Sequence, residues 1–266
     1  MPNVLPWPAR SVITATDGAR PAPRQRRRGL YDAAKALAIA LFRAQNISVR
    51  ITGAGNIPLT GGLILAPNHR AYYDVIPVSL PLQLRGDRKP RYMLKKEAFV
   101  NRPVSRILVG LGGIAVDRTP GRGATSFSAA VDALSAGEVV AVFPQGTIRH
   151  TPDVGDLKTG TVRMAAAAGV PIVPVGCAGT EKLWTRGRRP RLFGRRVTVR
   201  VVVGEPFYVG SDSDTAGTAD SAGTPDPAHI DVTAATGELR RRLQSVKDRA
   251  DRADRADRAD GTTAAG

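Results

Sequence analysis

Residues 63–74 read LILAPNHRAYYD, an unbroken apolar run followed by a polar turn. The run Leu63 to Ala66 is typical of a strand buried on both faces. Segments 113–116 and 139–143 have the same design, and the polar residues after them are Asp117, Arg118, Gln145, Gly146, Thr147 and Arg149. The carboxyl ends of parallel strands lie along one edge of a sheet, where ligands bind. We therefore expect the three turns to converge on one site.

Three more apolar runs, 91–94, 172–176 and 197–203, complete the expected set of strands. Helices are expected over 126–136, where apolar residues recur at helical spacing, and over 161–168, which stops before Gly169. Strands that alternate with helices predict an α/β fold, in which a central, mostly parallel sheet is flanked by helices.

The flanking segments differ in composition from this core. Residues 1–28 are rich in proline and end in a run of arginines, which predicts a flexible basic arm. Residues 29–209 form the predicted domain, and 210–230, rich in small and polar residues, form a predicted linker. A C-terminal helix is expected over 231–248. The Arg-Ala-Asp repeat beyond it predicts a low-complexity tail over 249–266 that takes no part in the chemistry.

The predicted domain begins with an amphipathic helix over 29–45. On a helical wheel one side is apolar and the other charged, and Ile39 does not fit this division. Next to the arginine run, such a helix suits the headgroup layer of an anionic membrane. It equally suits a first helix packed on its own domain, and the sequence leaves both interpretations open. The apolar side consists of Leu30, Ala34, Leu37, Ala38, Leu41 and Phe42, and the charged side of Asp32, Lys35 and Arg43.

The charge and the rare residue types limit the function. A formal net charge of +16, from 39 basic and 23 acidic residues, attracts polyanions such as phospholipid headgroups, phosphorylated small molecules or nucleic acid. The single cysteine excludes a disulfide within the chain, and three histidines with one cysteine argue against a zinc site. No apolar run reaches the roughly 18 residues of a spanning helix. Membrane contact is therefore expected to be peripheral.

His69 and Asp74 are the candidate catalytic pair. They are five positions apart, and on a continuous helix they would point about 140° apart. Pro67 disfavours a helix at His69, so we expect His69 in a loop and Asp74 at the start of a helix over 75–80. The carboxylate then accepts a hydrogen bond from one imidazole nitrogen and leaves the other free as a base. Imidazole titrates near neutral pH, which suits removal of a hydroxyl proton during attack on a thioester.

Other candidate residues fit catalysis less well. The sequence has no Gly-x-Ser-x-Gly elbow. Cys177 lies between small residues in an apolar run, as a buried structural thiol does. His150 follows a polar turn and is a candidate substrate contact. Because a histidine beside a carboxylate is often structural, this pair alone does not establish an enzyme.

Four ordered segments between about Asn56 and Phe207 resemble motifs of the 1-acylglycerol-3-phosphate acyltransferase family. Residues 68–74, Asn-His-Arg-Ala-Tyr-Tyr-Asp, are similar to the family's His-x4-Asp motif, in which the histidine is the base and the aspartate orients it. Segments 113–118 and 143–147 resemble the two motifs tied to acceptor binding, and 170–175 resembles the apolar motif on the acyl side. One such motif recurs by chance, whereas four in this order are specific.

The resemblance implies a glycerolipid acyltransferase-like fold and a reaction. A fatty acyl group would move from acyl-CoA or acyl carrier protein to 1-acylglycerol-3-phosphate and give phosphatidic acid, without a metal or other cofactor. His69 and Asp74 would be the catalytic residues. The implied substrate-binding residues are Asn68, Arg70, Lys95, Arg118, Gln145, Gly146, Thr147 and Arg149.

Two positions depart from the family's third motif. The family usually has glutamate where Gln145 stands, and often arginine where Ile148 stands, with Arg149 one place later. These changes leave open an acyltransferase of the same family that uses another lipid acceptor. An inactive lipid-binding protein is a further alternative, against which the complete His-Asp pair argues.

The expected partners follow from the same resemblance and from the charge. They are an acyl thioester, a lysophospholipid acceptor, acyl carrier protein and an anionic membrane surface, with the protein on the cytoplasmic face of the cell membrane. A nucleic acid is not expected as a partner, because only 5% of residues are aromatic and no nucleic-acid-binding motif occurs.

Overall fold

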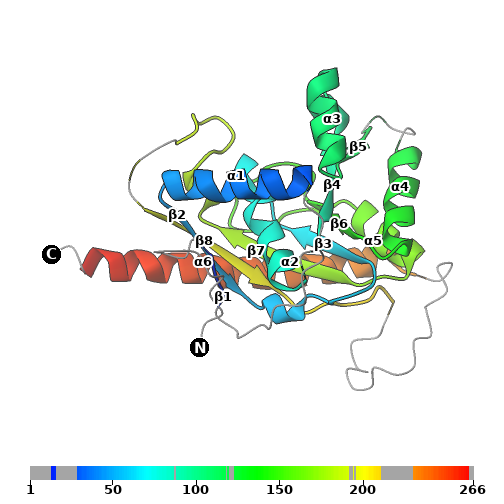
Figure 1. Cartoon of the computed structure of the whole chain (residues 1–266). Coiled ribbons are helices and arrows are strands. Elements are labelled where there is room, and N and C mark those ends of the chain that lie inside the picture. The colour runs from blue at the N-terminus through cyan, green and yellow to red at the C-terminus, as the bar shows by residue number, and fades with distance from the viewer. Residues whose placement is uncertain are drawn as a thin grey trace.

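The computed structural model describes residues 13–15, 29–86, 88–117, 119, 123–191, 194, 196–210 and 230–263, and for 13–15 and 258–263 only the backbone. Its strands are β1 (Ile13–Ala15), β2 (Ile47–Thr52), β3 (Leu63–Pro67), β4 (Pro90–Lys95), β5 (Ile114–Val116), β6 (Val139–Ala141), β7 (Ile172–Ala178) and β8 (Val197–Val203). They form one sheet in the order β1-β2-β8-β7-β3-β6-β4-β5 (Figure 1). Neighbours are parallel except β7 and β8, which are antiparallel. The predicted α/β fold is confirmed.

Helices cover both faces of the sheet. The α-helices are α1 (Leu30–Ala44), α2 (Leu80–Leu84), α3 (Arg102–Gly110), α4 (Ala124–Ser135), α5 (Gly160–Ala168) and α6 (Val232–Thr263). Short 3-10 helices are η1 (Ala54–Asn56), η2 (Tyr72–Val75), η3 (Pro77–Ser79), η4 (Lys96–Ala98) and η5 (Thr180–Lys182). α1 and α2 contribute to the core on one face, and α4, α5 and α6 to the core on the other. α3 has no buried residue and projects from the body of the molecule (Figure 1).

β3 lies between β7 and β6 and is buried on both faces. Leu63 and Leu65 point into the core on the α1 side, whereas Ile64 and Ala66 point into the core on the α4 side. This alternation is the normal period of two in a strand. Since β3 is parallel to both neighbours, the turns that follow β3, β6 and β7 lie along the same edge of the sheet.

Some elements differ from the sequence-based expectation. β1, β2 and α3 are not predicted. Apart from the helices expected over 75–80 and 231–248, the expected strands and helices begin or end within two residues of the observed bounds. The helix expected over 75–80 is replaced by η2, η3 and α2. Pro77 lies in the first turn of η3, and Pro81 lies in the first turn of α2. Proline lacks an N–H and cannot sit inside a continuous helix, which explains the interruption.

α1 packs on the domain and also exposes an apolar face. Phe42 is buried and Ile39 packs against the same core, so Ile39 belongs to the domain-facing side and is not a misfit. On the outward side Leu30, Leu37 and Leu41 are 49%, 62% and 48% exposed. Both interpretations of the amphipathic helix therefore keep support, because the two faces of α1 are separate.

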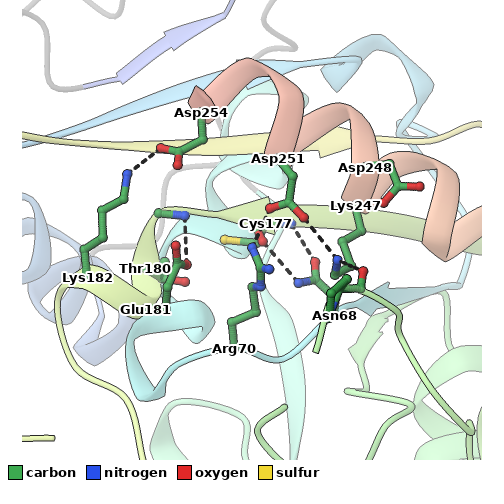
Figure 2. A network of polar contacts seen from close by, with 12 residues as sticks. Asn68, Arg70, Cys177, Thr180, Glu181, Lys182, Lys247, Asp248, Asp251 and Asp254 are labelled. Atoms are coloured by element: carbon green, nitrogen blue, oxygen red, sulfur yellow. Dashed lines mark hydrogen bonds and ion pairs between the residues drawn. The ribbon is translucent and has the colours of Figure 1, made fainter. Parts of the chain in front are cut away.

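The predicted end of the C-terminal helix at 248 is wrong, since α6 continues to Thr263. The Arg-Ala-Asp repeat places an aspartate every three residues, and the side chains step around the helix by about 60° each time. Asp251 pairs with Arg70 and Asp254 with Lys182 (Figure 2). Asp257 pairs with Arg200. Composition alone predicted a free tail because a charge-balanced repeat does not reveal distant partners.

α6 lies close against β7 and β8 (Figure 1). Gly176 of β7 permits this approach, because a Cβ at that position would collide with the backbone carbonyl of Val246. The other predicted flanking segments lie mainly outside the described residues, which exclude 1–12 and 16–28 of the predicted arm and 211–229 of the predicted linker. Within the arm, Ile13–Ala15 forms β1, parallel to β2.

We predict that removing the three aspartates from the α6 repeat destabilises the domain. In the triple variant Asp251→Asn, Asp254→Asn and Asp257→Asn, three partly buried cations lose their partners while helix propensity stays similar. The free energy of unfolding is expected to fall by about 2 kcal/mol. This lowers Tm by about 4–8 °C in thermal unfolding followed by circular dichroism. The matched control, Arg252→Gln with Arg255→Gln on the exposed side of α6, should leave Tm unchanged. Equal Tm values for both variants would show that the ion pairs contribute nothing.

Candidate active site

His69 and Asp74 meet at the carboxyl edge of β3. His69 follows the strand, and Asp74 lies in η2. The turn between them brings the imidazole Nδ1 to 2.9 Å from Oδ2 of Asp74. The hydrogen bond expected from the spacing is therefore present, although Asp74 sits in a 3-10 turn and not in an α-helix.

Asp74 is fully buried, and its carboxylate is satisfied by the protein. Oδ2 also accepts hydrogen bonds from the backbone N–H groups of Arg70, at 2.6 Å, and Ala71, at 2.8 Å. Oδ1 accepts a hydrogen bond from the hydroxyl of Thr180 at 2.5 Å. With the imidazole, these donors replace the water that a buried carboxylate loses.

His69 is held by contacts to its ring and its backbone. The ring stacks on Phe143 with 4.1 Å between the ring centroids. The backbone N–H donates to Gln145 at 2.6 Å, and the backbone carbonyl accepts from the N–H of Arg149 at 2.9 Å. The side chain is 19% exposed, and no hydrogen bond from the described part of the chain reaches Nε2. Because Nδ1 faces a carboxylate, the proton belongs on Nδ1 and Nε2 is available as an acceptor.

Two residues predicted to bind substrate belong to the framework of the site. Asn68 is buried, and its side-chain amide accepts from the backbone N–H of Cys177 at 2.6 Å and donates to the carbonyl of the same residue at 3.1 Å. Arg70 forms an ion pair with Asp251 at 2.5 Å (Figure 2). These groups have partners within the protein, and their contact with a substrate stays a prediction.

Gln145 and Gly146 also form hydrogen bonds within the protein. Gln145 is buried, accepts from the backbone N–H of His69 and donates to the carbonyl of Val154 at 2.9 Å. The backbone N–H of Gly146 donates to the carbonyl of Phe143 at 3.0 Å, which closes the turn. Both residues therefore shape the turn beside His69.

Of the remaining predicted substrate-binding residues, two lie in or beside this turn, one lies at the end of β4, and one lies outside the described residues. Thr147 is half-buried in the turn. The guanidinium of Arg149 lies against Gly155, and its buried Nε has no hydrogen-bond partner among the described residues. Lys95 is exposed at the end of β4. Arg118 lies outside the described residues.

Two further residues lie at the site without having been predicted. Thr180 touches Asp74 from the turn after β7. An apolar strand followed by the polar residues Gly179 and Thr180 has the same design as the other three strand-turn segments, so the signal is present in the sequence. Lys158 is exposed, and its side chain lies beside Gly146. The residues next to Lys158 in the sequence form no pattern that would predict it as a site residue.

The other candidate residues are accounted for by local contacts. Nε2 of His150 is 3.0 Å from the hydroxyl of Thr185, which donates to the carbonyl of Arg70. His150 thus supports the turn after β3. Cys177 is buried in β7, and burial raises the pKa of its thiol well above the usual value. The thiol stays protonated, which confirms the structural role expected for this residue.

An apolar groove of about 240 Å³ lies between α1, α3 and β4 and leads toward the site. Ile39, Leu80 and Leu108 are among the residues that line it. Tyr92 forms part of the lining and lies next to Phe143, with 6.4 Å between the ring centroids. Since Phe143 stacks on His69, these two rings connect the groove with the catalytic pair.

Neither a membrane span nor a metal cluster is found in the described part of the chain. Among those residues, no helix combines the length and the hydropathy needed to cross a bilayer. In the same ranges, His, Cys, Asp and Glu side chains do not gather in a group of three that could ligate a metal ion.

Comparisons with known proteins match the segment that contains His69 and Asp74. A family model described as Acyltransferase matches residues 48–178, which run from β2 to the end of β7 and include His69 and Asp74. Residues 48–178 of this chain belong to the acyltransferase family. The match covers the turns after β3, β4, β5 and β6, so the site lies within the family's own domain.

Similar proteins carry a more specific name. The 1-acyl-sn-glycerol-3-phosphate acyltransferase of Bacillus subtilis is 28% identical over 207 residues, covering 76% of this chain and 89% of that protein. A protein of the same name from Borreliella burgdorferi is 28% identical over 150 residues, covering 56% and 58%. The resemblance inferred from the four motifs is confirmed.

The fold of this acyltransferase domain has a counterpart among solved structures. The crystal structure of the 1-acyl-sn-glycerophosphate acyltransferase PlsC from Thermotoga maritima aligns with a TM-score of 0.54 and 22% identity, covering 82% of this chain and 78% of that one. This likeness supports the glycerolipid acyltransferase-like fold.

Proposed function

We propose that this protein transfers a fatty acyl group from the thioester of coenzyme A or acyl carrier protein to 1-acylglycerol-3-phosphate, giving phosphatidic acid. The hydrogen bond between His69 and Asp74 carries the proposal, because it leaves Nε2 of a partly exposed imidazole as a base. The names of the relatives from Bacillus subtilis and Borreliella burgdorferi support this acceptor.

In the proposed reaction, Nε2 of His69 takes the proton of the acceptor hydroxyl as its oxygen attacks the thioester carbonyl. The new ester C–O bond forms, the C–S bond breaks, and the imidazolium returns the proton to the leaving sulfur. The carboxylate of Asp74 stabilises the imidazolium between these two steps. Protons and electrons balance without a metal or redox cofactor.

The acceptor phosphate is proposed to bind beside the turn after β6. Arg149 offers a guanidinium whose Nε lacks a partner among the described residues, and Lys158 is exposed next to Gly146. Lys95, at the end of β4, adds a cation at the same edge of the sheet, and Arg118, outside the described residues, is a further cation that the family resemblance implies. Charge-assisted hydrogen bonds from these groups suit a phosphate monoester. The apolar groove beside Tyr92 suits the fatty acyl chain.

The second candidate acceptor is another lipid with a free hydroxyl or amine. It is favoured by Gln145, whose amide is occupied by His69 and Val154 and cannot offer the carboxylate found in the family's motif. Peripheral attachment to the cytoplasmic face of an anionic membrane is a separate part of the proposal. It is supported by the exposed leucines of α1 and the net charge of +16.

We predict that His69→Ala and Asp74→Asn each lower kcat for transfer from oleoyl-CoA to 1-acylglycerol-3-phosphate by about a hundred- to ten-thousandfold, because the base or its orienting partner is lost. Release of free thiol measures the rate, and circular dichroism checks the fold. His229→Ala, in the predicted linker, is the control and should keep the wild-type rate. A His69→Ala variant at the wild-type rate would refute the mechanism.

With oleoyl-CoA held constant, we expect 1-acylglycerol-3-phosphate to be the fastest acceptor in a panel that also contains lysophosphatidylethanolamine and a glycolipid. The phosphate monoester offers the most charge to Arg149 and its neighbours. Mass spectrometry of the products measures the preference. A faster reaction with an acceptor that lacks a phosphate monoester would favour the second candidate.

For membrane attachment, we predict that Leu37→Glu lowers binding to phosphatidylglycerol vesicles by about tenfold or more, because a charge enters the outward apolar face of α1. Co-sedimentation measures the bound fraction. Leu59→Glu is the matched control, since Leu59 is also exposed but precedes β3, on the edge of the sheet away from His69. If both variants bind like the wild type, another surface contacts the membrane.

A further inference from the structure

Within the part of the chain that the structure describes, Thr180 is the only residue outside the segment 69–74 that forms a hydrogen bond with the Asp74 carboxylate. Its hydroxyl donates to Oδ1 at 2.5 Å, while the imidazole and two backbone N–H groups share Oδ2. Thr180 is fully buried and follows β7, the strand beside β3. The two oxygens of one carboxylate are thus held from two strands.

The backbone around Thr180 is fixed. Gly179 has a φ of +94°, and a Cβ there would lie 2.5 Å from the carbonyl of Thr198, so a side chain at this position would clash. The N–H of Gly179 donates to the carboxylate of Glu181 at 3.0 Å, and the carbonyl of Thr180 accepts from the N–H of Leu183 at 2.9 Å. Lys182 is tied to Asp254 of α6 at 2.6 Å (Figure 2). The hydroxyl is therefore presented to Asp74 from a rigid turn.

A hydroxyl has a single proton to donate, and Thr180 gives it to Oδ1. This bond restricts rotation of the carboxylate and keeps Oδ2 directed at the imidazole. Without it, Oδ1 would be a buried, charged oxygen with no donor from the described residues, and a rotated carboxylate would relieve that loss at the expense of the bond to His69.

We propose that Thr180 is a positioning residue for acyl transfer, which aligns Asp74 so that it can stabilise the imidazolium of His69 in the transition state. This inference rests on the proposed function. The hydroxyl of Thr180 acts on the step in which the imidazole becomes charged and not on substrate binding. Its loss is therefore expected to lower kcat and to leave the acceptor KM unchanged.

The test compares Thr180→Val, which removes the hydroxyl and keeps the shape, with Thr180→Ser, which keeps the hydroxyl. We expect Thr180→Val to lower kcat by about ten- to a hundredfold, with the acceptor KM within about twofold, and Thr180→Ser to stay within about threefold of the wild type. Thr161→Val is the matched control, because Thr161 is equally buried and its hydroxyl has no hydrogen-bond partner among the described residues. It should keep the wild-type kcat.

A second comparison separates positioning from a general loss of structure. In an Asp74→Asn background, Thr180→Val should lower kcat little further, because both changes act on one interaction. A wild-type kcat in a folded Thr180→Val variant overturns the inference, and so does an equal fall in Thr180→Ser. If Thr180→Val does not fold, Thr180→Ala takes its place against Thr180→Ser. A wild-type protein that transfers acyl groups to no acceptor overturns the proposed function, and this inference with it.

Discussion

A carboxylate in a protein interior is tolerated only where hydrogen bonds replace its lost water. Asp74 meets this condition through donors that the fold brings from two strands: the turn after β3 supplies the imidazole and two backbone N–H groups, and the turn after β7 supplies the hydroxyl of Thr180. A shift of either turn relative to the other would deprive one of the two buried carboxylate oxygens of its donors. The position of His69 in this acyltransferase domain therefore depends on the register between β3 and β7.

The rest of the molecule maintains that register. Asn68 ties the end of β3 to β7 through the backbone of Cys177. Gln145 ties the turn after β6 to His69, and α6 contacts the turns after β3 and β7 through Asp251 and Asp254. These polar side chains near His69 hold the structure, so the groups left for the substrate are Nε2, the cations around Arg149 and the apolar groove beside Tyr92.

Local patterns predicted the centre of the fold and the catalytic pair. The apolar run at Leu63 and the proline before His69 act over a few residues, so the strand, the loop and the contact with Asp74 follow from the sequence. The direction of a polar side chain does not, since Gln145 lies at the predicted edge but its amide points inward. Thr180 is 106 positions from Asp74, and Asp251 is 181 from Arg70. Contacts at such separations depend on strand order and helix placement, which composition and periodicity do not encode.

The central claim is that the carboxylate of Asp74 holds His69 with its proton on Nδ1, leaving Nε2 as the base. The most direct measurement is nitrogen NMR of the protein with ¹⁵N-labelled histidine, at a pH where the imidazole is neutral, with His69 assigned by its absence in a His69→Gln variant. This account predicts a protonated Nδ1 and an unprotonated Nε2 for His69. The opposite tautomer, with the proton on Nε2, would contradict it.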